Sequence, residues 1–418
     1  MLKSTMNQNK VQTLKGFRDF LPEAMAVRNY VKNLLIDTFE TFGFEPIETP
    51  TLEYSSVLMG KYGDEGDKLV YSFTDNGDRQ IGMRYDLTVP TAKVLAMYSQ
   101  TIPMPFKRYQ IQPVWRAENT QKGRYREVLQ CDIDTFGTNS PIADAEILAV
   151  INTVLQKLNF KTFTILINSR IVLNNILKAC KITEDKNSIL QSLDKFSKIG
   201  QDGVTKELIG KNIPKAKITV LFKYIKQAQP DEYLQNVINQ LKILGVSKNN
   251  YQFDPTIVRG LDYYTGPIFE TVVTKPKIGS ITGGGRYDNL IKSLGGPDIS
   301  AVGTTIGLDR IVDCITELNL LPNLPKTKTK VLFANFGDKT VNQSLKLITE
   351  LRNNNIASSF YPDNDKLSKQ FKYADSLGIP FVAMIGTDES KNNQVTLKNM
   401  ATGEQKTINQ SNLLAQFV

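Results

Sequence analysis

Residues 105–137 read PFKRYQIQPVWRAENTQKGRYREVLQCDIDTFG, and the rest of the fold can be arranged around this stretch. Apolar residues alternate with polar ones up to Trp115, a loop rich in Gln, Lys, Gly and Arg follows, and apolar residues resume from Val128. Alternation on both sides of such a loop predicts two antiparallel strands joined by it. Pro113 suits an edge or an irregular position of the first strand, because proline has no N–H to donate to a strand pair.

The same stretch carries many charges of both signs. A hairpin of this kind can bring guanidinium groups and carboxylates to one open face, where they would form a binding site. Ordinary surface charges on a solvated hairpin explain the same residues equally well, and the hairpin alone leaves both interpretations open. The arginines and acids of the stretch are Arg108, Arg116, Arg124, Arg126, Glu118, Glu127, Asp132 and Asp134.

Length and composition indicate an ordinary globular protein. The chain has 418 residues, 41% hydrophobic and 22% charged, which predicts two or three domains with ample core. No apolar run approaches the roughly 18 residues needed to cross a bilayer, and residues 1–13 lack the apolar segment of a secretory signal. The three cysteines show neither metal-binding spacing nor a disulfide framework. We therefore expect a soluble, cytoplasmic protein with no membrane partner and no protein metal site.

The net charge of +9 is unevenly distributed along the chain. Residues 170–250 hold 14 Lys/Arg and 7 Asp/Glu, and residues 326–418 hold 12 and 8. Two basic segments suit appendages that hold a polyanion, although lysine-rich surfaces also serve solubility alone. The chain contains no histidine, which excludes a histidine base, nucleophile or metal ligand.

Periodicity predicts the order of elements before and after the hairpin. A helix with an apolar stripe over 27–42 ends at Gly43, and a strand follows over 44–53. The sequence Asp75-Asn76-Gly77-Asp78 predicts a tight turn between two strands. Residues 170–250 have helical periodicity and predict an inserted helical domain. The further elements that we expect are a helix over 142–158, strands over 163–168, 254–260 and 268–274, a turn and helix starting at 283–288, a strand over 301–308 and a helix over 309–320.

The C-terminal part has a different pattern. Residues 321–329, LPNLPKTKT, have the composition of a linker. Beyond it, apolar strands are predicted over 331–336, 356–361 and 381–385, with helices over 341–353 and 366–377. A β-α-β-α-β order implies a parallel or mixed sheet with right-handed crossovers.

Three separated motifs resemble those of class II aminoacyl-tRNA synthetases, and the closest similarity is to the histidyl-tRNA synthetase family. PVWRAENTQKGRYREVLQCDID within the hairpin resembles the second class II motif, VRGLDYYTGPIFE from Val258 the histidine-specific motif, and GTTIGLDRI from Gly303 the third class II motif. The N-terminal helix, strand and proline resemble the first motif, which builds the dimer interface in that family. The resemblance implies an α+β catalytic domain with an antiparallel sheet, a helical insertion and a C-terminal α/β anticodon-binding-type domain. The implied boundaries are 1–169 and 251–325 for the two parts of the catalytic domain, 170–250 for the insertion and 326–418 for the last domain.

The resemblance also implies an activity. A histidine–tRNA ligase of this family uses ATP and Mg²⁺ to convert L-histidine into histidyl-adenylate, transfers the histidyl group to the 3′ end of tRNA(His), and works as a homodimer. In the first step the substrate carboxylate attacks the α-phosphorus of ATP. Such a step depends on positioning and on cations more than on a strong base, which suits a chain that has an arginine in each of these motifs and no histidine.

Site residues carry over by matching positions in the motifs. The resemblance implies Arg259 and Arg116 as catalytic residues at the α-phosphate, with Arg116, Glu118 and Arg310 binding ATP. Glu118 would meet the adenine amino group and Arg310 the γ-phosphate. The implied histidine-binding residues are Asp86, Thr88, Gln130, Asp134, Arg259, Tyr263 and Tyr264. The implied tRNA-binding residues, in the basic loop, are Lys122, Arg124 and Arg126.

An acid and a phenol, Asp134 and Tyr264, can satisfy both nitrogens of an imidazole, and such a site rejects analogues that lack them by ~10⁴-fold or more. Some family members carry glutamate at the positions of Asp86 and Asp134. Tyr263 serves equally as a packing residue. Gly283–Gly285 suggest either close backbone approach to the bound amino acid, with Tyr287 as a wall, or a tight turn.

Two other functions compete with the ligase. A non-catalytic paralogue, acting as a regulatory subunit of histidine biosynthesis or as a sensor, would share the motifs. Such regulatory subunits usually lack the C-terminal domain, and degenerate paralogues lose motif residues that are present here. An unrelated α/β RNA-binding protein would not explain three motifs in order.

Overall fold

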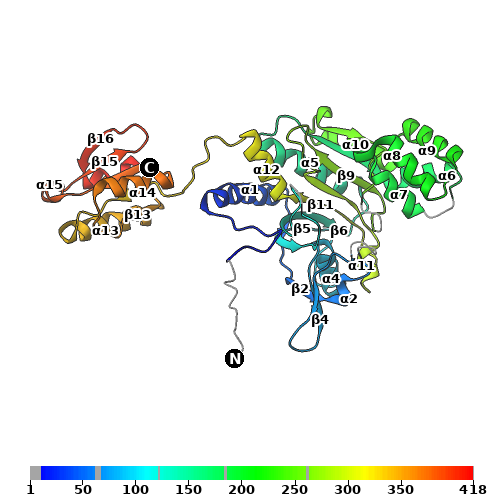
Figure 1. The fold of residues 1–418 in the computed structure, drawn as a ribbon, viewed down its shortest axis with the longest axis horizontal. Coiled ribbons are helices and arrows are strands. Elements are labelled where there is room, and N and C mark those ends of the chain that lie inside the picture. Colours follow the sequence, from blue (N-terminus) through cyan, green and yellow to red (C-terminus); the bar gives the residue numbers. More distant parts are fainter. Residues whose placement is uncertain (1–10, 62–66, 121–122, 183–185, 260–262, 418) are drawn as a thin grey trace, which may run out of the picture. The chain divides into compact units, whose positions relative to one another are not determined.

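The computed structural model describes residues 11–61, 67–120, 123–182, 186–259 and 263–417, and it divides into two compact units (Figure 1). One unit comprises Met1–Asp19 with Tyr30–Leu321, and the other comprises Phe20–Asn29 with Pro322–Val418. The first unit contains all three motifs of the sequence. The four domain boundaries expected above stay predictions.

A large sheet forms the centre of the first unit. In the described residues it has eight strands in the order β1-β5-β6-β11-β10-β9-β7-β8. Every neighbouring pair is antiparallel except β1 with β5 and β7 with β8. The antiparallel sheet that we predicted is therefore confirmed, with a parallel pair at each edge. The strands are β1 (Glu45–Pro46), β5 (Phe106–Trp115), β6 (Glu127–Phe136), β7 (Thr164–Ser169), β8 (Tyr251–Phe253), β9 (Pro267–Val272), β10 (Thr282–Arg286) and β11 (Ala301–Gly307).

The predicted hairpin is the longest strand pair of this sheet. β5 and β6 pair antiparallel over ten residues each, from Phe106 opposite Phe136 to Trp115 opposite Glu127. Pro113 lies inside β5, but the short strand β1 reaches only Arg108 and Tyr109. Pro113 therefore has a strand neighbour on one side only, and the missing N–H costs no ladder hydrogen bond.

Three local predictions were wrong. The strand expected over 254–260 is β8, which ends at Phe253, because the carboxylate of Asp254 accepts from the backbone N–H of Thr256 at 2.9 Å and turns the chain. The strand expected over 44–53 is two short strands in different sheets, β1 and β2. The turn and helix expected at Gly283 is the strand β10. Consecutive glycines are typical of turns, but here they lie between two neighbouring strands.

A small sheet and several helices surround the large sheet. The predicted turn at Asp75 joins β3 to β4, and the Asp75 carboxylate accepts from the backbone N–H groups of Gly77 and Arg79, both at 2.9 Å. α5 packs on β6, β10 and β11 with eleven buried residues and begins at Ser140, whose hydroxyl caps it. These elements are α1 (Pro22–Thr41), β2 (Leu52–Tyr54), α2 (Ser55–Leu58), β3 (Ser72–Thr74), β4 (Gln80–Met83), α4 (Thr88–Tyr98), α5 (Pro141–Lys157), α11 (Leu290–Ser293) and α12 (Leu308–Leu318).

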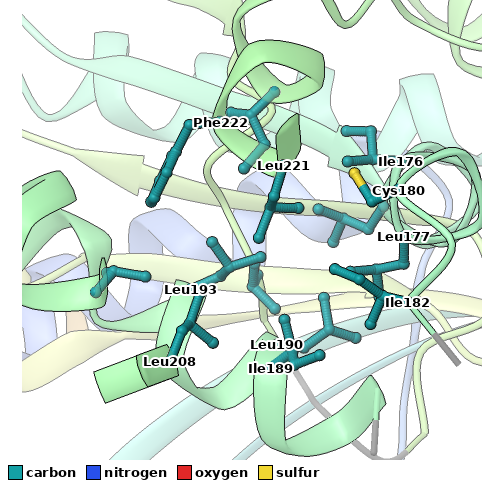
Figure 2. Packing of buried hydrophobic residues seen from close by; sticks show 14 of the residues in the cluster. Ile176, Leu177, Cys180, Ile182, Ile189, Leu190, Leu193, Leu208, Leu221 and Phe222 are labelled. Carbon is teal, nitrogen blue, oxygen red and sulfur yellow. The ribbon is translucent and has the colours of Figure 1, made fainter. Parts of the chain in front are cut away.

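The helical insertion packs into the same unit. Its helices bury an apolar core that includes Leu177, Leu190, Leu208 and Leu221 (Figure 2). That core continues into the large sheet through Ile268 of β9. The elements are α6 (Arg170–Ala179), α7 (Lys186–Asp194), α8 (Phe196–Gly210), α9 (Lys215–Gln227), α10 (Glu232–Ile243) and η1 (Lys248–Asn250).

The second unit has a sheet of its own. Within residues 322–417 its strands run β13-β12-β14-β15-β16, with β12 parallel to β13 and β14 and the last two pairings antiparallel. The predicted mixed α/β sheet is confirmed, although β15 and β16 were not predicted. α13 and α14 contribute to different apolar clusters, so the sheet is covered on both faces. The elements are β12 (Val331–Phe333), α13 (Asp338–Asn353), β13 (Ser358–Phe360), α14 (Leu367–Leu377), β14 (Phe381–Met384), α15 (Thr387–Lys391), β15 (Gln394–Asn399), β16 (Gln405–Asn409), η2 (Gln410–Asn412) and η3 (Leu414–Gln416). None of the helices that the structure describes in either unit has the length and hydropathy to cross a membrane.

Candidate active site

A cavity of about 850 Å³ opens over the sheet of the first unit. Gln130, Asp132 and Asp134 occupy alternate positions of β6, so their side chains share one face of the strand and line this cavity. The register places Gly307, Thr305 and Gly303 of β11 opposite these three residues. Polar side chains on β6 and small residues on β11 therefore line the cavity at the sheet.

The three motif arginines line this one cavity. Arg116, Arg259 and Arg310 come from three segments, the first and last of which are 194 residues apart, and Arg124 of the basic loop also lines the cavity. The Arg116 guanidinium lies over the Tyr85 ring and its Nε donates to the Tyr85 carbonyl at 3.0 Å. Burial lowers the pKa of Arg310, and the charges of the other three arginines lower it further. Four guanidinium groups thus give this cavity a positive potential, which favours a ligand with several negative charges.

Arg259 is held beside the glycine-rich strand. Its Nε donates to the Glu270 carboxylate at 2.7 Å. A Cβ at Gly283 would lie 2.3 Å from Nη1 of Arg259, so a side chain at this position would force the guanidinium to move. The glycine of β10 therefore makes room for a site arginine. We expected the backbone at Gly283 to lie close to the bound amino acid. In this structure the side chain that lies against Gly283 is that of Arg259.

Glu118 is paired in this structure. Arg124 donates to both of its oxygens, from Nη2 to Oε1 at 2.9 Å and from Nε to Oε2. Burial alone would raise the pKa of Glu118, but the hydrogen bond and charge of Arg124 hold it below its usual value. An adenine contact at Glu118 therefore requires Arg124 to share or leave this carboxylate.

The residues expected at the substrate ammonium group come from two elements, the start of α4 and the strand β6. Asp86 and Thr88 precede and begin α4, and the Asp86 carboxylate accepts from the N–H of Val89 at 3.0 Å. Gln130 is 7% exposed, and its Oε1 has no hydrogen-bond partner among the described residues. All three line the cavity.

Asp134 is fixed from two sides. Its Oδ2 lies 2.6 Å from Nη2 of the fully buried Arg108, and the hydroxyl of Tyr287 donates to its Oδ1. Burial raises the pKa of Asp134, and the charge of Arg108 opposes that shift. A Cβ at Gly303 would lie 1.7 Å from Asp134 Oδ1, so this carboxylate occupies the space that a side chain on β11 would fill.

Three tyrosines line the cavity together with Asp134. The rings of Tyr263 and Tyr264 are 4.6 Å apart, and each lies within 6.5 Å of the Tyr287 ring. Burial raises the pKa of Tyr264 to about 12, so its phenol stays protonated at neutral pH and can donate or accept. Asp134 and Tyr264 thus line the same cavity, as the imidazole hypothesis requires.

The three residues of the basic loop that we expected to bind tRNA differ in their relation to the cavity. Arg124 lines the cavity, whereas Arg126 does not, because its Nε donates to the Glu118 carbonyl at 3.1 Å. Lys122 lies outside the described residues. Sequence reasoning did not assign Asp132, which lies on the cavity face between Gln130 and Asp134. The two-residue spacing on a predicted strand was the signal that would have found it.

Comparison with known proteins gives a consistent result. Residues 16–311 match the family model described as histidyl-tRNA synthetase, and residues 330–418 match an anticodon binding domain. The chain is 40% identical over 444 residues to a histidine–tRNA ligase of Phocaeicola vulgatus, with 96% of this chain and 97% of the relative covered. A histidine–tRNA ligase of Christiangramia forsetii is 40% identical over 438 residues, with 94% and 96% covered.

A solved structure agrees. The crystal structure of histidyl-tRNA synthetase from Nostoc sp. PCC 7120 superposes with a TM-score of 0.85 at 29% identity, covering 97% of this chain and 98% of that one. The sequence similarity and the structural similarity both cover the large sheet, the insertion and the second unit. With the three motif arginines around one cavity and the matches covering nearly the whole chain, the chain belongs to the histidyl-tRNA synthetase family.

Proposed function

We propose that this chain is a histidine–tRNA ligase, which activates L-histidine with ATP and transfers the histidyl group to tRNA(His). The observation that carries the proposal is the single cavity in which four arginines face an acid and a phenol. The arginines supply positive charge for a polyphosphate, while the acid and phenol supply partners for an imidazole. A non-catalytic paralogue would have no need for this complete set.

In the first step the histidine carboxylate attacks the α-phosphorus of ATP, and pyrophosphate leaves. We assign Arg116 and Arg259 to the α-phosphate and Arg310 to the γ-phosphate. Their fixed guanidinium groups stabilise the charge on the transferring group without having to reorganise. Asp86, Thr88 and Gln130 hold the ammonium group, so the carboxylate is directed toward the phosphorus.

In the second step a ribose hydroxyl at the tRNA 3′ end takes the histidyl group from the adenylate. Arg124 at the cavity is the described residue of the basic loop that we assign to the acceptor end, with Lys122 as a further candidate. We expect phosphate contacts there before base readout. The second unit, which matches an anticodon binding domain, is assigned to the anticodon end.

We propose Mg²⁺ as the counter-ion of ATP. Among the residues that the structure describes, no cluster of three or more His, Cys, Asp or Glu is placed to hold a metal ion. Two cavity carboxylates are already engaged, Glu118 with Arg124 and Asp309 with Arg18 at 2.6 Å. The ion would therefore bind chiefly through phosphate oxygens and water, which is usual for Mg²⁺ in nucleotide sites. A homodimer and a cytoplasmic location are also proposed, on the strength of family membership.

Histidine-dependent exchange of pyrophosphate into ATP tests the first step, and charging of tRNA(His) tests the second. Purified protein should support exchange with histidine and with none of the other standard amino acids. Absence of exchange with any amino acid would favour the non-catalytic paralogue, and exchange without charging would confine the activity to adenylation.

A further inference from the structure

Two buried carboxylates share one guanidinium at the cavity wall. Asp132 and Asp134 are 1% and 3% exposed, and both line the cavity. Arg108, on the neighbouring strand β5, is fully buried and lies 2.6 Å from Asp134. Oδ1 of Asp132 has no hydrogen-bond partner in the described part of the chain. If both acids were ionised, the group would carry one uncompensated negative charge.

Burying an unpaired charge is costly, so Asp132 holds a proton more readily than an ordinary aspartate. Burial raises its pKa to about 7, the charge of Asp134 adds to this shift, and the charge of Arg108 opposes it. The elements packed around Asp132 contribute Arg108 from β5, Asp134 from β6, a hydrogen bond from Thr305 of β11 and the charge of Asp86 before α4. Tyr264, before β9, is within its field and stays neutral.

Resting on the proposed function, we propose that Asp132 is a second acidic partner of the substrate side chain, and that histidine is bound with its ring as imidazolium. The cation supplies the positive charge that the pair of carboxylates and the single guanidinium lack. Oδ1 of Asp134 accepts from Tyr287, and Oδ2 of Asp134, although it makes no hydrogen bond of good geometry, lies 2.6 Å from the Arg108 guanidinium. Oδ1 of Asp132 has no hydrogen bond in the described part of the chain and is the oxygen that we assign to the ligand. Asp132 thereby becomes a specificity-determining residue, because a ring of similar shape that is not basic leaves this oxygen unpaired.

The proposal fixes the number of protons exchanged on binding. The complex holds one proton on the Asp132–imidazole pair. At pH 8 the free Asp132 carries about 0.1 proton and a free imidazole with a pKa of ~6.5 carries even less, so binding takes up about 0.9 proton. At pH 5.5 both free groups are largely protonated, and binding releases about 0.9 proton. Histidine affinity is therefore greatest between these pH values and falls on both sides.

Isothermal titration calorimetry of the full chain with histidine, in buffers of different ionisation enthalpy, measures this proton count. We expect an uptake close to one at pH 8 for the unaltered chain and close to zero for Asp132→Asn, which should also bind histidine at least tenfold more weakly. Asp298→Asn, which alters an exposed carboxylate paired with Lys292, is the matched control and should keep the uptake. Binding without uptake at pH 8, or an unchanged uptake in Asp132→Asn, overturns the proposal.

A second measurement uses the unaltered chain and is independent of how the variant folds. In 1,2,4-triazol-3-ylalanine the ring keeps its shape but is a much weaker base than imidazole. The unaltered chain should prefer histidine at least tenfold at pH 7, and equal affinities would contradict a bound imidazolium. A chain that binds no histidine at all would refute the proposed function itself, whereas binding with no proton uptake refutes only the charge assignment.

Discussion

Replacing Gly303 by alanine tests how the Asp134 carboxylate is held. The added Cβ would lie 1.7 Å from Oδ1 of Asp134 and 2.4 Å from its Cγ, while contacts under 3.0 Å are essentially never observed. The carboxylate must therefore move by about 1.3 Å or more, because neighbouring backbone in a paired strand yields little. Such a shift breaks the 2.6 Å contact with Arg108.

The cost should appear mainly in histidine recognition. A displacement of about 1 Å in a catalytic site is enough to lower the rate by ~10²-fold, and 100-fold in kcat/KM corresponds to about 2.7 kcal/mol. Overpacking of a tight strand pair should also lower the free energy of unfolding by about 1–3 kcal/mol. Pyrophosphate exchange at varied histidine and varied ATP gives the two KM values, and denaturant unfolding gives the stability.

Two variants make the result interpretable. Gly210→Ala adds a Cβ that meets nothing within 4 Å, so it should leave the histidine KM unchanged and, at the end of the helix α8, should raise the free energy of unfolding by at most about 1 kcal/mol. In an Asp134→Ala background the clash with the carboxylate is gone, so Gly303→Ala should destabilise the chain by about 1 kcal/mol less than it does alone. An unaltered histidine KM in Gly303→Ala, or a stability loss that is additive with Asp134→Ala, would refute the proposed geometry.

Two further changes address the phosphate site and a buried ion pair between α5 and β10. Arg259→Ala should reduce pyrophosphate exchange by about 10²–10³-fold while leaving the thermal midpoint nearly unchanged, because the guanidinium is partly exposed and acts on the transition state; an unchanged exchange rate would remove Arg259 from the mechanism. Asp144→Asn should lower the free energy of unfolding by about 1.5–3 kcal/mol, because it removes the carboxylate 2.5 Å from the buried Arg286 and leaves this guanidinium with the more distant carboxylate of Asp288, at 3.3 Å. Urea unfolding measures this, and a loss below 1 kcal/mol would mean that Tyr233, whose hydroxyl donates to Asp144 at 2.8 Å, or water compensates.

Strand alternation and turn chemistry allowed the hairpin to be predicted from the sequence. In β5 and β6 both faces follow a period of two, and the turn at Asp75 uses side-chain oxygens that only a few residue types offer. The glycines of β10 could not be placed in the same way. Gly283–Gly285 have no side chain, so they contribute no periodicity, and a local rule assigns them to a turn. Their strand position is decided by long-range pairing with β9 and β11, which no local window contains.

The site residues also differ in whether they could be predicted from local sequence. Motif matching placed Arg116, Arg259 and Arg310, and the structure brings them to one cavity. Motif matching assigned no role to Arg108 or Asp132, because the role of each depends on charges that meet only when β5 and β6 pair. Arg108 is opposite Asp134 in the register, so its charge is compensated only once β5 and β6 are aligned. Charge pairs of this kind are visible in a sequence only after the register is known.

The helical insertion contributes to the active site as well as to the basic surface. Asn187 and Gln191, one turn apart on α7, line the cavity, and Asp194 at the end of the same helix is within the field of Arg259. The core of the insertion also contains Val258, the residue before Arg259. Because protein cores are close-packed, the insertion cannot shift without disturbing the backbone next to Arg259. The helices of the insertion therefore share a packed core with the segment that carries Arg259, a residue assigned to the chemistry.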